Sequence, residues 1–307
     1  MKFGLQFYSF TWPGGPEAIG PTLARAVRTA DEVGFDSLWV MDHFWQIGRP
    51  ESELQPMLEG WTTLGFMAAH SQRARLGLMV GGVHYRNPGL WVKAATTLDV
   101  LTGGRAWLGI GAAWNQAESE GLGFPFPPLG ERFEQLEETL QIANGMWQGE
   151  RGSEEDFQGR RFHASRLLNV PQSISRPRVP IMIGGGGEKK TLRLVAQYAD
   201  ASNLFGGPEQ LVPKYAILAE HCEAVGRDFT EIERTNYQPI ALGRSGESAD
   251  QLIGRFGRLA EAGVQHVILG IADADDAAAI ERFGRDVLPR LRSLEAADPR
   301  RLASTTA

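Results

Sequence analysis

The chain has 307 residues, of which 42% are hydrophobic and 22% charged, and its formal net charge is −6. These values are typical of a globular protein and exclude a disordered or fibrous one, while the acidic balance disfavours nucleic acid as a partner. Cys222 is the only cysteine, which excludes an intrachain disulfide and a cysteine-based zinc site. Neither a signal peptide nor a run of about 18 apolar residues is found, so we expect a cytoplasmic protein that binds no membrane.

Short apolar segments alternate with longer amphipathic ones along the whole chain. This alternation predicts repeated strand–helix units. Apolar runs such as residues 76–80 and 267–269 are expected in a parallel sheet that is covered on both faces. Eight such units predict an α/β protein with a (β/α)8 TIM barrel, as a single domain over residues 1–296. The predicted strands cover residues 2–8, 37–43, 75–82, 106–113, 180–186, 201–205, 234–242 and 266–271.

Proline and glycine mark the predicted helix ends. Pro21 is expected to open a helix that Gly34 closes, and Pro88 is expected to open another. Residues 149–178 are polar and too long for an ordinary connection, which predicts an insertion between the fourth helix and the fifth strand, with a small hairpin over the barrel mouth. Residues 297–307 are expected to form a flexible tail.

Candidate functional residues follow the strands, because the function of such a barrel gathers at the carboxyl-terminal strand ends. The second strand leads into Asp42 and His43. The carboxylate offers an orienting group, and the imidazole offers a proton donor or acceptor that titrates near neutral pH. An isolated Asp-His pair is more often structural, and its position after a strand is what favours catalysis here.

The fifth strand leads into Gly184, Gly185, Gly186 and Gly187, followed by Lys189 and Lys190. Glycine-rich amides at a helix start, with lysines in the first turn, predict a phosphate cradle. The alternative is a flexible turn with solvated lysines. The motif is neither a Walker loop nor a dinucleotide fingerprint.

Aromatic residues and one more histidine also follow predicted strands or lie near them. We expect them to form an aromatic-walled pocket for a medium-sized organic molecule as substrate. These residues are Trp12, Trp45, His84, Tyr85 and Trp114. For the tryptophans, packing in the core or wall is the default alternative. No histidine and carboxylate cluster has the spacing of metal ligands, so no metal is expected.

Taken together, five segments resemble the bacterial luciferase-like superfamily, and within it the deazaflavin-dependent oxidoreductases (LLM class) that use coenzyme F420. The matching segments are residues 37–44, 85–88, 97–105, 108–115 and 183–189, in family order. The resemblance implies a barrel that holds the deazaflavin ring in its mouth, with His43 and Asp42 as catalytic residues. It also implies a non-proline cis peptide at Met79-Val80. The implied cofactor-binding residues are Asp42, Met79, Val80, Gly82, Ile110, Gly111, Asn115, Gly184, Gly185, Gly186, Gly187, Lys189 and Lys190.

The function that this resemblance implies is hydride transfer between deazaflavin C5 and an organic substrate, as reduction of an activated C=C, C=N or C=O bond or oxidation of an alcohol. Two alternatives stay open: an FMN-dependent luciferase-like monooxygenase, and a non-catalytic flavin- or deazaflavin-binding protein. Family members that oxidise sugar phosphates carry a glutamate where this chain has Ala112, which disfavours that substrate class. Barrels of this family often pair, so a homodimer is a further expectation.

Overall fold

The computed structural model describes residues 1–48, 52–241, 246–271 and 273–300. Within them, eight parallel strands form a closed barrel, in which each strand hydrogen bonds to the next and the last returns to the first. All eight predicted strands are present, and the predicted TIM barrel is confirmed. The strands are β1 (Lys2–Phe7), β2 (Ser37–Val40), β3 (Arg75–Leu78), β5 (Ala106–Gly111), β10 (Ile181–Gly184), β11 (Ala201–Phe205), β12 (Glu233–Ile240) and β13 (His266–Ile271).

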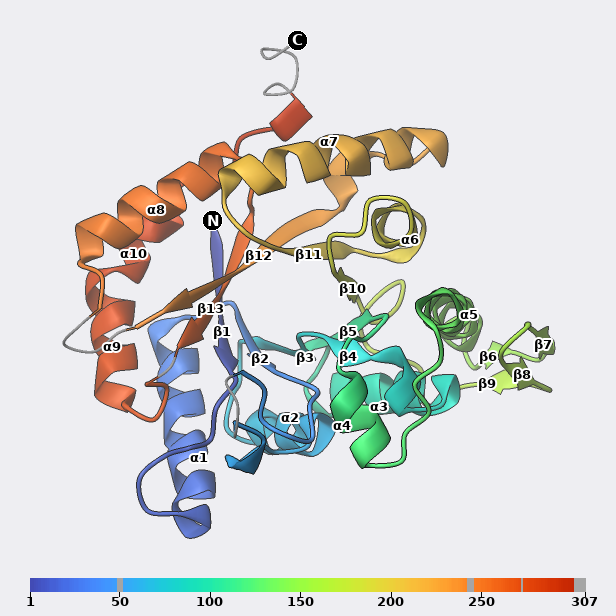
Figure 1. Cartoon of the computed structure of the whole chain (residues 1–307), viewed down its shortest axis with the longest axis horizontal. Coiled ribbons are helices and arrows are strands. Elements are labelled where there is room, and N and C mark those ends of the chain that lie inside the picture. The colour runs from blue at the N-terminus through green and yellow to red at the C-terminus, as the bar shows by residue number, and fades with distance from the viewer. Residues whose placement is uncertain (49–51, 242–245, 272, 301–307) are drawn as a thin grey trace.

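Helices surround the strands (Figure 1). The long ones are α1 (Pro16–Val33), α2 (Gly60–Ala68), α3 (Pro88–Leu101), α5 (Leu129–Met146), α6 (Thr191–Tyr198), α7 (Pro208–Ala224), α8 (Ala249–Glu261) and α9 (Ala277–Asp286). Shorter elements are α4 (Gln116–Gly121), α10 (Leu288–Arg292) and the 3-10 turns Ser52–Leu54, Val83–Tyr85 and Phe229–Glu231. Pro16, and not Pro21, opens α1, because the first helical position needs no N–H donor. Gly34 closes α1 at φ 100°, as predicted.

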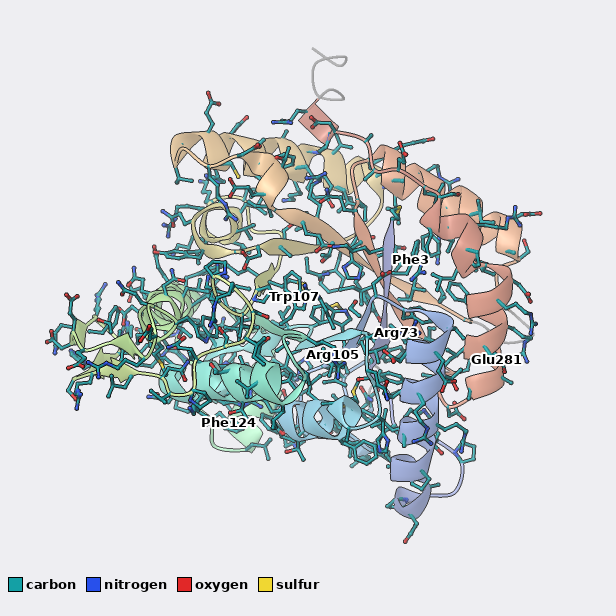
Figure 2. The ribbon with its side chains drawn as sticks, turned by 180° about the vertical axis from the view of Figure 1, so that it is seen from behind. Phe3, Arg73, Arg105, Trp107, Phe124 and Glu281 are labelled. Atoms are coloured by element: carbon teal, nitrogen blue, oxygen red, sulfur yellow. The ribbon has the colours of Figure 1, made fainter. Side chains whose placement is uncertain are left out.

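Two apolar cores hold the barrel together. The larger one lies between the strands and the surrounding helices. The smaller one fills the barrel interior and comprises Trp39, Met79, Trp107, Met182, Ala201 and Ile268. Figure 2 shows Trp107 inside the ring of strands, whereas Glu281 lies on the outer side of α9. The filled interior leaves the strand ends as the place where a ligand can enter.

The insertion lies beside the barrel, not over its mouth. Its short strands form two antiparallel pairs, β6 (Gly152–Ser153) with β9 (Leu167–Leu168) and β7 (Phe157–Gln158) with β8 (His163–Ala164). Figure 1 shows them beyond α5, away from the strands. Leu167 is buried against Gly145 of α5, and Ser175 donates its N–H to Asp99 of α3. The predicted small hairpin corresponds to β7 and β8, which lie between β6 and β9 in the chain, but the insertion does not lie over the mouth as predicted.

The start of the predicted tail is attached to the barrel. Ala297 donates its N–H to the carbonyl of Ala260, and the ring of Pro299 lies against Gly263. Residues 301–307 of the predicted tail and residue 242 of the predicted seventh strand lie outside the described residues.

Candidate functional site

A cavity of about 750 Å3 opens at the carboxyl-terminal ends of the barrel strands. This volume lies within the range of small-molecule and cofactor sites. Segments that follow β2, β3, β5 and β10 line it, and all four were predicted from the sequence. The predicted residues that line it are Asp42, His43, Met79, Val80, Gly82, Tyr85, Gly111, Trp114, Asn115, Gly184, Gly185, Gly186 and Gly187.

Asp42 borders the cavity but is held by an arginine that the sequence analysis did not single out. Arg86 donates to both carboxylate oxygens of Asp42, at 2.7 and 2.8 Å, and to Glu59 at 2.6 Å. Burial raises the pKa of the Asp42 carboxyl, and the guanidinium of Arg86 opposes that shift. With both oxygens engaged, Asp42 is suited to orient a neighbour and not to carry a proton.

His43 contacts a second carboxylate, that of Glu118. The imidazole Nδ1 lies 2.8 Å from Glu118 Oε2, and the ring meets Trp114 edge to face at 5.5 Å between centroids. The His43 side chain is 13% exposed, and the Glu118 side chain is fully buried. Since Nδ1 is engaged behind the cavity wall, Nε2 is the ring nitrogen left to act toward the cavity.

Glu118 lies on the short helix α4, and sequence reasoning missed it. Its carboxylate also accepts hydrogen bonds from the backbone N–H groups of Phe44 and Trp45 and from the Tyr85 hydroxyl. Burial acts to raise the pKa of Glu118, but these donors and His43 outweigh it and lower the pKa. The sequence gives only a weak indication of this role, because it shows no more than a carboxylate three residues after Asn115, which caps α4.

The third barrel strand is interrupted where it meets the cavity. A cis peptide joins Met79 to Val80, as the resemblance implied, and the chain resumes as β4 (Gly81–Gly82) beside β5. The Val80 side chain lies between Gly111 and Gly184, where a Cβ atom on Gly184 would collide with it and one on Gly111 would make a tight contact. Glycines on two neighbouring strands therefore make room for this cavity wall.

The chain leaving β5 contributes Gly111, Trp114 and Asn115 to the cavity. Ala113 adopts φ 61°, a left-handed conformation that is uncommon outside glycine. Trp114 is 65% exposed at the rim. The side chain of Ile110 is fully buried in the outer core, because alternate residues of a strand face opposite sides. A contact of the Ile110 backbone with the cofactor remains a prediction.

The glycine loop after β10 presents free backbone donors. Gly185 donates its N–H to Asn203, whereas the structure shows no acceptor, within the described residues, for the N–H groups of Gly186 and Gly187. Helix α6 begins only at Thr191, so Lys189 and Lys190 lie in the turn before it and not in its first turn as predicted. Neither lysine lines the cavity, but the Lys190 ammonium lies 5.4 Å from the ring of Phe133, which does. The loop therefore offers amides and nearby cations to an anionic group.

Three predicted pocket residues lie behind the cavity wall. Trp12 is 7% exposed and packs on Phe10, and Trp45 packs against Gly121 of α4. The His84 ring packs at a tilt against the ring of Tyr85, and its Nε2 hydrogen bonds to Ser119. None of the three side chains lines this cavity, because a position after a strand does not fix where the side chain points.

His84 is held neutral in this position. Ser119 donates its hydroxyl to the carbonyl of Asn115, so His84 Nε2–H must donate to Ser119 Oγ. His84 Nδ1 is buried and has no hydrogen-bond partner among the residues that the structure describes. Burial lowers the pKa of His84 to about 4, and the charge of Arg132 adds to that shift. This histidine is thus a packing residue and not an acid or base of the site.

The cavity also has walls that were not predicted. These walls come from Gln6 of β1, Tyr8 directly after it, Phe205 of β11, Tyr237 of β12 and Phe133 of α5. Burial raises the pKa of Tyr237 to about 12, so its hydroxyl is neutral at physiological pH. These residues supply most of the aromatic wall. These residues could have been predicted from the fold, because the carboxyl-terminal ends of all eight strands of a barrel face the same mouth.

The described residues contain no group of three or more His, Cys, Asp or Glu side chains that could hold a metal ion. In the same part of the chain, we find no helix with the length and apolar character that crossing a bilayer requires.

Comparison with known proteins places this geometry in context. The family model described as luciferase-like monooxygenase matches residues 1–306. The F420-dependent glucose-6-phosphate dehydrogenase of Nakamurella multipartita is 30% identical over 251 residues, which cover 79% of this chain and 70% of that protein.

Solved structures that share the fold include two with different cofactors in their names. The coenzyme F420-dependent tetrahydromethanopterin reductase of Methanopyrus kandleri has a TM-score of 0.77 at 17% identity, over 94% of this chain and 99% of that one. The oxygenating constituent of 3,6-diketocamphane monooxygenase from Pseudomonas putida, in complex with FMN, has a TM-score of 0.72 at 17% identity, over 94% and 98%. At these identities the likeness shows the fold alone, and this fold accommodates both kinds of cofactor.

Proposed function

The chain belongs to the luciferase-like monooxygenase family, and on that basis we propose that it is an F420-dependent oxidoreductase that transfers a hydride between deazaflavin C5 and a medium-sized organic substrate. The curated relative with 30% identity is named as an F420-dependent enzyme, which supports this cofactor. The observation that carries the proposal is the joining, in one cavity, of a glycine loop with free amides and a histidine backed by a carboxylate.

The residues present fit a flat ring with an anionic tail. The free N–H groups of Gly186 and Gly187 are donors for a phosphate, with Lys189 and Lys190 adding positive charge. Val80 and Gly111 form a wall against which a flat ring can lie, and Asn115 lines the same cavity. The contacts of Asp42, Met79 and Gly82 with the ring remain part of this proposal.

When bound, the deazaflavin would supply a hydride donor or acceptor at C5. The chain supplies position and a proton. His43 Nε2 is free to act toward the cavity. In a reduction, His43 would donate a proton to the substrate, and in an alcohol oxidation it would accept the proton that the substrate loses. Asp42, paired with Arg86, would keep the segment after β2 in place.

The cavity walls favour an organic substrate with apolar surface. Trp114, Leu129, Phe133, Phe205 and Tyr237 line the same cavity as His43. Such walls suit an enone, an imine, an aldehyde or an alcohol of moderate size. Ala112 lines the same cavity and offers no acid or base.

Two other functions use the same features. An FMN monooxygenase also needs a phosphate cradle, and the FMN complex on this fold supports that alternative. A protein that binds the cofactor without turnover would need the cradle but not the His43–Glu118 pair.

The proposed reaction is tested by anaerobic mixing with reduced F420 and a panel of enones, imines, aldehydes and ketones, following reoxidation by absorbance. We expect reoxidation with at least one substrate class, and its loss in His43→Ala. Tight binding of F420 with no reoxidation across the panel, and none of the reverse reaction with alcohols, would favour the non-catalytic alternative.

A further inference from the structure

We propose that Glu118 is a positioning residue that fixes the tautomer of His43, so that neutral His43 always presents an unprotonated Nε2 to the cavity. This inference deepens the proposed function and rests on it only for the use of His43 as a proton carrier. Ala112 stands where family members that oxidise sugar phosphates carry a glutamate, so that position offers His43 no second acid or base. The structure supplies a carboxylate from α4 instead, behind the imidazole.

The Glu118 carboxylate can act only as a hydrogen-bond acceptor. Its Oε1 accepts the backbone N–H groups of Phe44 and Trp45, the second at 2.7 Å. Its Oε2 accepts the Tyr85 hydroxyl and lies 2.8 Å from His43 Nδ1. Backbone N–H groups cannot accept a proton, and the side chain is fully buried. A proton on Oε1 would face two N–H donors, and the donors around the carboxylate lower the pKa of Glu118, so the group is ionised.

An ionised carboxylate at this distance decides which nitrogen of His43 carries the proton. With hydrogen on Nδ1, the pair forms a charge-assisted hydrogen bond. With hydrogen on Nε2 alone, a lone pair on Nδ1 would face the lone pairs of Oε2 across 2.8 Å. The first arrangement leaves Nε2 unprotonated, and no group within the described residues bonds to it. The carboxylate also stabilises the imidazolium that forms when Nε2 takes a proton.

The position of Glu118 is set independently of His43. Asn115 caps α4 by accepting the N–H of Glu118, and its carbonyl accepts the Ser119 hydroxyl. The two backbone bonds to Phe44 and Trp45 tie the segment after β2 to the same carboxylate. The other titratable groups near the imidazole are Tyr85, which shares Oε2, and Asp42, whose charge Arg86 offsets. The imidazole is thus oriented against a fixed acceptor.

The substitution Glu118→Gln tests this role while keeping the shape of the side chain. The carbonyl of the introduced amide can still accept from Phe44 and Trp45, which turns the NH2 group of that amide toward His43 and Tyr85. A donor facing Nδ1 requires a lone pair there, so the proton moves to Nε2 and His43 loses its acceptor. Tyr85→Phe is the matched control, because it removes one donor to Oε2 and leaves the carboxylate in place.

The tautomer is measured by 15N NMR of the cofactor-free protein at about pH 9, where an imidazole is neutral. We expect the Nδ1–H tautomer for His43 in the wild type and in Tyr85→Phe, and the Nε2–H tautomer in Glu118→Gln. An Nε2–H tautomer in the wild type overturns the proposal. The wild-type spectrum therefore tests the proposal even if a variant does not fold.

Activity and binding supply the second readout. With reduced F420, Glu118→Gln should lower kcat by about 100- to 10,000-fold and flatten the pH profile of kcat, with the affinity for F420 unchanged. A Glu118→Gln enzyme with wild-type kcat overturns the proposal. If the wild type does not bind F420, the proposed function is contradicted. The tautomer of His43 is measured without F420, so that result is independent of this outcome.

Discussion

The side chain of Val80 occupies the space that a Cβ atom on Gly184 would need, since an ideal Cβ there would lie 2.6 Å from Val80 Cγ2. Val80 follows the break in the third barrel strand, and Gly184 ends β10. Both residues line the cavity. Because Gly184 has no side chain, the Val80 side chain can form part of the cavity wall beside it.

Gly184→Ala should destabilise the protein by about 1–3 kcal/mol, because the added methyl group forces Val80 to move. Gly186→Ala is the matched control in the same loop, since its Cβ would meet no atom closer than 3.7 Å. Chemical denaturation measures both. The double variant Gly184→Ala/Val80→Ala should recover part of the loss; equal stability of Gly184→Ala and the wild type would contradict the steric account.

His43→Ala should reduce turnover by about 100-fold or more while the affinity for F420 changes little, because the imidazole carries a proton and does not hold the phosphate. Steady-state kinetics and fluorescence titration separate the two effects. His163→Ala serves as the control, since His163 lies exposed in the insertion, away from the cavity. A His43→Ala enzyme with an unchanged rate would remove the role assigned to His43.

Lys189→Ala/Lys190→Ala should weaken F420 binding by roughly three- to tenfold and reduce its salt dependence, because both exposed lysines lie beside the glycine loop. The deazaflavin chromophore without its phosphate-bearing tail is the matched ligand, and its affinity should not change. Titrations at two salt concentrations measure both ligands. An equal loss for the two ligands would place the effect at the ring and contradict the cradle.

His84→Phe should make stability less sensitive to acid. Folding lowers the pKa of His84 from 6.5 to about 4, so the unfolded chain binds a proton over this interval and the folded one does not. Falling pH therefore destabilises the wild type progressively between these two values, by on the order of 2 kcal/mol after allowance for partial solvent screening. Denaturation from pH 7 to pH 4 should show a shallower decline for His84→Phe; parallel curves would contradict the assignment.

The barrel could be predicted from the sequence because its signals are local. Apolar runs mark the strands, and the cap at Gly34 requires a left-handed residue that glycine adopts easily. The position of the insertion could not be predicted in this way. Its packing depends on contacts such as Leu167 against Gly145, which join residues distant in the sequence and leave no local pattern.

Cavity residues that directly follow strands could be predicted from the sequence. Residues whose position depends on a helix or on the direction of the side chain could not. Asp42, His43 and the glycine loop were found at strand ends. Glu118 lies on a short helix, and its meeting with His43 spans 75 positions in the chain. Trp45 was misplaced because its backbone lies near the cavity while its side chain turns toward α4.

The most direct test of the account is a parallel titration of the purified, cofactor-free protein with F420 and with FMN, following the fluorescence of each. The cavity that joins the Gly184–Gly187 loop to His43 is proposed to hold the deazaflavin, so F420 should bind the more tightly and should lose affinity when Lys189 and Lys190 are replaced. Tight binding of FMN with no binding of F420 would contradict the central claim and favour the monooxygenase alternative.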